Sequence, residues 1–247
     1  MITKRIIPAL YVKQGKLVGA ENFEGSLVEL AQAYSAGGAD ELAFYELAAP
    51  AGEKTLLVKA LKEVAKMVFI PLTVGGGIRS TADFEQVLAC GADKVCVNSG
   101  AIKNPALVGE AARKYGDQCV VLSVDVRRVN DSYCVFTNGG KVFTDLDAIE
   151  WVHRCVGEGA GEVIVNSLDA DDKKNGFDIP LLEKVCNRVN VPVIASGGAA
   201  KEEDFVDLFR KIPVVDAGLA STIFHLQKVN VNHLKETLAK NNVNVRW

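Results

Sequence analysis

The sequence predicts an α/β protein whose eight parallel strands close into a barrel, and three observations support this fold class. Short runs of apolar and β-branched residues alternate with longer amphipathic stretches along the whole chain. Most of the short runs are nearly continuously apolar, which is typical of parallel strands buried on both faces. The two halves of the sequence also repeat each other.

The predicted strands are Arg5–Val12, Glu41–Leu47, Ile70–Val74, Lys94–Asn98, Val120–Val126, Glu162–Leu168, Val191–Ala195 and Asp216–Ala220. Helices are predicted between most of them, for example over Ser26–Gly37, Thr55–Met67, Ser80–Ala89 and Ala106–Tyr115. The one long loop, Arg127–Thr144, is expected to contain a small hairpin formed by Tyr133–Phe136 and Gly139–Phe143 around Asn138-Gly139-Gly140. No linker interrupts the pattern, so we expect residues 1–247 to form a single domain.

The internal repeat has an offset of 121 residues. It aligns Ile70–Ile78 with Val191–Ala199, and Gly38–Glu41 with Gly159–Glu162. A period of this length fits two half-barrels of four βα units each, rather than a solenoid. Because four parallel strands cannot cover their own edges, we expect the halves to join into one (β/α)8 barrel, a TIM barrel with twofold internal symmetry.

Composition excludes several functional classes. The formal net charge is −3 and no basic cluster exceeds the pair Arg127-Arg128, which argues against nucleic acid as a partner. The opening residues are charged too early for a signal peptide, no apolar run approaches a membrane span, and three scattered histidines give no support to a metal site. The cysteines lack CxxC spacing and are expected to be buried free thiols of a cytoplasmic protein. They are Cys90, Cys96, Cys119, Cys134, Cys155 and Cys186.

Turns rich in glycine and hydroxyl side chains follow the third and fourth predicted strands and, in the second half, the seventh and eighth. They lie at the end of the barrel where such folds carry their active sites. Glycines let the backbone approach an anion, and helix N-termini favour negative charge. Each turn taken alone is more often a plain tight turn. Their twofold repetition predicts two phosphate sites on opposite sides of the mouth, and a substrate with a phosphate at each end. The predicted contacts are Gly77, Asn98 and Ser99 in one half and Gly198, Ser221 and Thr222 in the other.

Asp125 is the main acid–base candidate, because it ends the very apolar fifth strand, where an ionised carboxylate needs a partner or a task. The repeat places it opposite Tyr11 at the end of the first strand. A phenol with an ordinary pKa near 10 donates a proton but is a poor base at neutral pH. The alternative is a structural carboxylate paired with Arg127 or Lys13.

Two further groups of charges have two interpretations each. The acidic segment Asp169–Lys174 after the sixth strand is either a solvated loop or a substrate-binding loop that uses Asp171. Four charges near the strand starts form either a salt-bridge ring at the bottom of the barrel or ordinary solvent-facing charges. They are Arg5, Glu41, Lys94 and Glu162.

Over nearly its full length the chain resembles the cyclase subunit of imidazole glycerol phosphate synthase, an enzyme of histidine biosynthesis. The resemblance is specific, because several of the shared strings have no packing reason to recur together. They include Lys4–Pro8, Asn22-Phe23, Ala39–Leu42, Pro71–Ile78, Gly91–Val95, Gly159–Glu162, Asn175–Asp178, Ala195–Ala199 and Val243–Arg246.

The resemblance implies a glutaminase partner, forming a heterodimer at the N-terminal face of the barrel. It also implies ammonia that passes through the barrel to a bis-phosphorylated ribulosyl substrate, no cofactor, and imidazole glycerol phosphate and an aminoimidazole carboxamide ribotide as products. The family's phosphate contacts, gate charges and one catalytic aspartate fall on the residues named above, the aspartate on Asp125. Asp93 matches a residue that faces the glutaminase.

The departures from the family lie at the mouth. The second catalytic aspartate of the family falls at Tyr11, a cysteine at Ala9, a loop lysine at Gly19, and an aspartate at Glu46; a loop glycine falls at Asp172. The loop after Asn22-Phe23 is also shorter. Two hypotheses follow: a cyclase that uses glutamine-derived ammonia with Asp125 as its acid–base group, or a diverged or engineered barrel that binds a glutaminase, conducts ammonia or binds a ligand without turnover.

Overall fold

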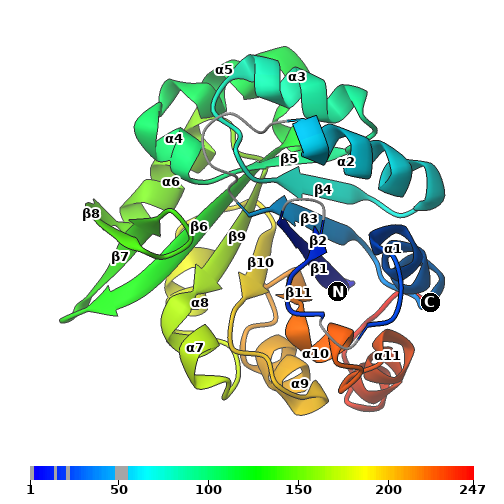
Figure 1. Ribbon diagram of the computed structural model, residues 1–247. Helices are drawn as coiled ribbons and strands as arrows, with labels where there is room; N and C mark the ends of the chain where they lie inside the picture. The colour runs from blue at the N-terminus through cyan, green and yellow to red at the C-terminus, as the bar shows by residue number, and fades with distance from the viewer. Residues whose placement is uncertain (1–2, 14–15, 21–22, 48–54) are drawn as a thin grey trace.

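The computed structural model describes residues 3–13, 16–20, 23–47 and 55–247, and its strands form a sheet that closes on itself (Figure 1). Eight parallel strands make the wall, in the order β5-β4-β3-β1-β11-β10-β9-β6, and β6 pairs with β5 to complete the circle. This confirms the predicted (β/α)8 TIM barrel. The wall strands are β1 (Arg5–Lys13), β3 (Leu42–Glu46), β4 (Leu72–Gly75), β5 (Lys94–Val97), β6 (Val120–Val129), β9 (Glu162–Ser167), β10 (Val193–Ser196) and β11 (Ala217–Ala220).

Helices surround this wall (Figure 1). The longer ones are α1 (Leu27–Ala36), α2 (Thr55–Met67), α3 (Thr81–Ala89), α5 (Ala106–Tyr115), α6 (Ala148–Glu158), α8 (Ile179–Cys186), α9 (Glu202–Lys211) and α11 (Val231–Lys240). Short helices follow several strand ends, namely α4 (Ser99–Lys103), α7 (Leu168–Lys173) and α10 (Thr222–His225), and a 3-10 turn, η1 (Asp117–Cys119), precedes β6. Helix starts are set by local side chains: Ser26 and Glu29 form a capping box at α1.

The predicted hairpin is present but begins earlier than expected. β7 (Ser132–Thr137) and β8 (Val142–Asp147) pair antiparallel and project from the barrel (Figure 1). Residues 127–129, expected to be loop, instead extend β6, because they pair with β7. A two-residue strand, β2 (Lys16–Leu17), folds back on β1 in the same antiparallel way. These antiparallel pairs are additions to the end of the barrel and form no part of its wall.

Two hydrophobic cores hold the fold together. The larger lies between the strands and the helices and includes fully buried Phe44, Phe84 and Phe205. The smaller fills the barrel interior and is made of Ile7, Ala9, Ala43, Cys96, Val121, Ile164, Ile194, Ala217 and Leu219. All six cysteines are free thiols, but Cys119, Cys134 and Cys186 are only half-buried, so the expectation of full burial is wrong for these three.

The sequence repeat is also a repeat of hydrogen bonds. Asp93 accepts from the backbone N–H of Leu72 at 2.8 Å, and Asp216 accepts from that of Val193 at 2.9 Å. These residues are equivalent in the two halves. Each carboxylate therefore ties the start of one strand to the start of its neighbour in the same way.

A buried ion pair fastens the last helix to the bottom of the barrel. The Nζ of Lys235 lies 2.8 Å from Oδ1 of Asp40, and both side chains are almost fully buried. Asp40 also accepts from the backbone N–H of Ile6 at 2.8 Å, while Lys235 donates to the carbonyl oxygen of Arg246 at 2.8 Å. The pair thus joins α11, the carboxyl end of the chain and the first strand.

Replacing Lys235 should destabilise the protein strongly, because the buried carboxylate of Asp40 would lose its buried cation and keep only the exposed Arg246, whose Nε lies 3.7 Å away. We expect Lys235→Ala to lower the free energy of unfolding by about 3–5 kcal/mol in urea denaturation. The control is Lys240→Ala on the exposed face of the same helix, which should change it by less than about 0.5 kcal/mol. Equal effects of the two substitutions would contradict the assignment.

Candidate active site at the barrel mouth

Asp125 lies at the mouth of the barrel and is held by two amides. Its Oδ2 accepts from Nδ2 of Asn98 at 3.0 Å, and its Oδ1 accepts from Nδ2 of Asn166 at 2.9 Å. The side chain is buried, with 8% of its surface exposed. The alternative of an ion pair with Arg127 is wrong, because the guanidinium of Arg127 instead contacts two carboxylates of α7.

Opposing effects act on the ionisation of Asp125. Burial raises its pKa above the ordinary value, since the charged form loses water. The hydrogen bonds from Asn166 and Asn98 act in the opposite direction, because they stabilise the carboxylate. Asp125 is therefore a buried carboxylate whose only described partners are neutral donors, an arrangement suited to taking up a proton.

Tyr11 lies at the same end of the barrel and is protonated at neutral pH. Burial raises its pKa, and the negative charges of Asp125 and Asp171 raise it further. Its ring stacks on that of Tyr45, with 5.4 Å between centroids and 20° between planes. Both rings cap the interior core. Tyr11 can therefore donate a proton near Asp125 but cannot act as a second base.

Tyr45 fits here because β4 ends in a glycine. A Cβ on Gly75 would lie 2.8 Å from the Tyr45 ring and 3.1 Å from the Cβ of Cys96. Tyr45 is also hydrogen-bonded to Cys96, and burial raises the pKa of that thiol to about 12. The thiol therefore stays neutral inside the barrel.

The acidic segment after β9 is a helix, so the expectation of a loop is wrong. Ser167 caps α7 by accepting from the N–H of Ala170. From α7, Asp171 pairs with Lys174 just after the helix at 2.5 Å, and Asp169 accepts from the backbone N–H of Arg128 at 2.7 Å. The charge of Asp171 reaches Tyr11, so this helix borders the mouth.

The two predicted phosphate turns have matching backbones. Asn98 and Ser221 precede α4 and α10 with φ/ψ of −129°/−98° and −129°/−76°, and neither side chain caps its helix. Gly77 and Gly198 both have positive φ, +68° and +97°. The hydroxyl of Ser99 accepts from the backbone N–H of Asn138 at 3.1 Å, which leaves its proton free to donate. The first half therefore contains the predicted group Gly77, Asn98 and Ser99; the second contains Gly198, Ser221 and Thr222.

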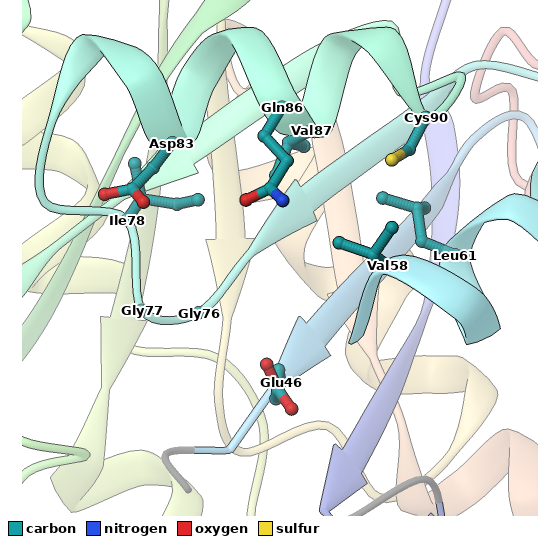
Figure 2. Close-up of a pocket in the computed structure, with 10 residues that line it drawn as sticks. All are labelled: Glu46, Val58, Leu61, Gly76, Gly77, Ile78, Asp83, Gln86, Val87 and Cys90. Carbon is teal, nitrogen blue, oxygen red and sulfur yellow. The ribbon is translucent and has the colours of Figure 1, made fainter. Parts of the chain in front are cut away.

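A small cavity of about 40 Å³ lies behind the first turn, between α2 and α3 (Figure 2). Figure 2 shows Gln86 pointing toward Glu46 across this space, with Leu61 facing Cys90. Burial raises the pKa of Glu46. A cavity of this size holds a few waters and no larger ligand.

The predicted salt-bridge ring is present at the opposite end of the barrel. Arg5 contacts Glu41 at 2.9 Å and Glu162 at 2.6 Å. Lys94 contacts the same two carboxylates, at 2.8 and 2.7 Å, so the four charges form a closed ring. Thr73 adds a hydrogen bond to Glu41 at 2.6 Å. The alternative of ordinary solvent-facing charges is wrong, because both glutamates are buried.

Sequence reasoning missed two residues of this site, Asn166 and Tyr45, and the contact that Ser196 makes. Asn166 binds Asp125, Ser196 donates to Oδ1 of Asn166 at 3.1 Å, and Tyr45 supports Tyr11. A signal for Asn166 was available, because a polar residue near the end of an apolar strand is the same pattern that identified Asp125. Of the residues named for the family resemblance, Asn22 lies outside the described part of the chain.

Comparisons with known proteins agree with one another. A model of the family described as "Histidine biosynthesis protein" matches residues 5–230. The imidazole glycerol phosphate synthase subunit HisF of Bacillus cereus (strain G9842) is 44% identical and aligns over 100% of both chains. The subunit of the same name from Leuconostoc mesenteroides subsp. mesenteroides is 45% identical and aligns over 99% of each. Within the described residues, no group of three or more histidine, cysteine or acidic side chains could hold a metal ion, and no helix could cross a membrane.

Gly198→Ala should weaken anion binding at the second turn, because the new Cβ would lie 2.2 Å from the carbonyl oxygen of Gly176 at a φ of +97°. We expect inorganic phosphate to shift the backbone amide NMR signals of both turns in the unmodified protein. In the variant the second turn should bind at least about tenfold more weakly, which is the effect of losing one hydrogen bond to an anion. Gly157→Ala in α6, where a Cβ meets nothing within 4 Å, is the matched control. No response to phosphate at either turn of the unmodified protein would refute the assignment.

Proposed function

The chain belongs to the histidine biosynthesis protein family, and we propose that it is the cyclase subunit of imidazole glycerol phosphate synthase. The observation that carries this proposal is the 44–45% identity to subunits of that synthase over essentially the whole chain. The two turns at the mouth support it, because a substrate with a phosphate at each end needs two anion sites facing one reaction centre. Such a subunit is a lyase of amino-acid biosynthesis, active without a cofactor.

In this proposal, the turns at Gly77 and Gly198 hold the two phosphates and place the reacting part of the substrate above Asp125. Asp125 takes up a proton during ring closure. Tyr11, which stays protonated, supplies one to the opposite side. Pairing a base with an acid of very different pKa separates the two roles.

The ring at the bottom of the barrel is proposed to control the entry of ammonia made by a glutaminase partner. Four charges in mutual contact form a polar layer, and the interior core above them is apolar. A neutral ammonia molecule crosses such a core at lower cost than ammonium, because burying a charge is expensive. Opening the ring would admit ammonia while the apolar layer excludes ions.

The alternative is a barrel that binds a glutaminase or a ligand without turnover. It was suggested by Tyr11 in place of a carboxylate. Tyr11 can still donate a proton, and the full-length identity to synthase subunits supports the enzyme. An assay that supplies ammonium directly separates the two, because it needs no partner.

We expect the purified chain to convert the bis-phosphorylated substrate with ammonium salts, and Asp125→Asn to lower kcat by about 10²–10⁴-fold, the usual loss for a general base. Tyr11→Asp should raise kcat, because a carboxylic acid gives up its proton more readily than the Tyr11 phenol, whose pKa is raised by burial, and adding Asp125→Asn should remove the gain. Asp207→Asn on the outer helix α9 is the control and should leave kcat unchanged. A kcat that survives Asp125→Asn would refute the assigned role of Asp125, and no turnover by the unmodified chain would favour the alternative.

A partner at the N-terminal face would find exposed apolar side chains there. Phe69 precedes β4 and has 90% of its surface exposed, and Val214 precedes β11 with 56% exposed. Trp247 ends the chain, near the start of β1, and is 76% exposed. Asp93 is exposed at the same end, but its carboxylate already holds the N–H of Leu72. Phe69 is therefore a cleaner probe of docking than Asp93.

Phe69→Asp should weaken binding of the glutaminase subunit by about 2 kcal/mol, or about 30-fold in Kd, because it removes an exposed aromatic anchor and introduces a charge. Isothermal titration calorimetry measures the change. Phe143→Asp is the matched control, since Phe143 is an exposed aromatic of β8 at the opposite end of the barrel. Equal weakening by both substitutions, or by neither, would place the partner elsewhere.

A further inference from the structure

Asp125, Asn166 and Ser196 form a lateral row across three neighbouring strands. Asp125 of β6 is in register with Asn166 of β9, and Asn166 is in register with Ser196 of β10. Their side chains are joined in the same order: Ser196 Oγ donates to Asn166 Oδ1 at 3.1 Å, and Asn166 Nδ2 donates to Asp125 Oδ1 at 2.9 Å. The three side chains therefore form one continuous chain of hydrogen bonds, which follows the register of the strands and ends at the carboxylate of Asp125.

Asp125 determines which end of the Asn166 amide faces it, because a carboxylate only accepts, and Ser196 binds the other end. An amide has a donor and an acceptor of nearly the same shape, and in the flipped orientation its oxygen would face the carboxylate and repel it. The NH2 group therefore points at Asp125, and the Ser196 hydroxyl donates to the amide oxygen and holds the side chain in place. Ser196 is buried and cannot easily exchange this contact for water.

The second amide on Asp125 lacks this kind of support. Asn98 also donates to the carboxylate, but its Oδ1 atom is buried and has no hydrogen-bond partner among the described residues. Among the described contacts, Asn98 is therefore held at the NH2 end of its amide and not at the oxygen. Asn166 is instead hydrogen-bonded at both ends of its amide.

We propose that Asn166, held in place by Ser196, is a positioning residue that keeps the carboxylate of Asp125 ionised and aimed into the mouth. This proposal rests on the proposed cyclase function for its catalytic consequence, but the coupling of Asn166 to Asp125 is a property of the free protein. Asn166 acts through Asp125 and need not touch the substrate.

The direction of the effect follows from the chemistry of the carboxylate. Asn166 donates to the charged form and so lowers the pKa of Asp125, against the rise caused by burial. Removing that donor raises the pKa, so a larger share of Asp125 is protonated and inactive as a base at low pH. Above the new pKa the carboxylate is ionised again, and the rate returns to its plateau.

The test compares Asn166→Leu, which keeps the size of the side chain but removes the donor, with the unmodified chain in the ammonium-dependent assay. We expect the acid limb of kcat/KM against pH to move upward by about 1 unit, the effect of roughly one hydrogen bond to a charge. At pH values below both limbs kcat/KM should fall about tenfold, while the plateau and KM stay within about twofold. Ser196→Ala should move the limb in the same direction by less, and Ser196→Thr, which keeps the hydroxyl, should restore it.

Asn241→Leu is the matched control, because Asn241 makes its one side-chain hydrogen bond to the carbonyl oxygen of Thr237, at the end of α11. It should leave the acid limb in place. A lower plateau for Asn166→Leu with an unmoved acid limb would overturn the proposal, because that is the signature of a merely structural residue.

A second measurement does not depend on turnover. The pKa of Asp125 can be followed by NMR in protein labelled with ¹³C at the aspartate carboxyl carbons, with Asp125→Asn used to assign its signal. We expect the pKa to rise by about 1 unit in Asn166→Leu and by less in Ser196→Ala. An unchanged pKa would overturn the positioning role even if the enzyme is active. A raised pKa in a chain without cyclase activity would uphold the coupling and refute the proposed function instead.

Discussion

The hydrogen bonding of β5 to β6 is the contact on which the rest of this molecule depends. It joins the two halves of the sequence and removes the last open edges of the sheet. It also fixes the register, so that Asn98, directly after β5, meets Asp125 on β6. At the other end it brings Lys94 toward the glutamates of β9 and the segment before β3. Barrel closure thus assembles the mouth and the charged ring together.

The barrel separates its polar groups by height. Four charges neutralise one another at the bottom, small and aliphatic side chains fill the middle, and carboxylate, amides and phenols collect at the top. Because the middle layer is apolar, the charged groups on either side of it, in the ring and at Asp125, lie next to a region of low dielectric constant. Charged groups there are stable only when paired, as in the ring, or hydrogen-bonded by neutral donors, as at Asp125. Buried charge is thus stabilised by ion pairs at the bottom of the barrel and by neutral amide donors at the top.

Most of the fold could be predicted from the sequence, because apolar runs indicate buried strands and the internal repeat indicates two equivalent half-barrels. All eight wall strands and the four example helices appear near their predicted bounds. The errors arose where local pattern and tertiary pairing compete. Arg127 has the composition of a loop residue but continues β6 because β7 pairs with it, and Asp169 belongs to a helix that Ser167 caps. The position of Asn166 near the end of an apolar strand is visible in the sequence, but its contacts with Asp125 and Ser196 depend on the register across three strands.

The contact between Gly75 and Tyr45 constrains how this barrel can change over evolutionary time. The ring of Tyr45 occupies the space that a side chain at position 75 would need. The two positions are therefore epistatic: a larger residue at 75 is tolerated only after the one at 45 becomes smaller, and a tyrosine at 45 could be acquired only on a glycine background. Because Tyr45 in turn stacks on Tyr11, a lineage that acquired this aromatic pair could not lose its members in arbitrary order. The packing of the Tyr45 ring against the backbone of Gly75 therefore limits the order in which residues at the mouth can be substituted.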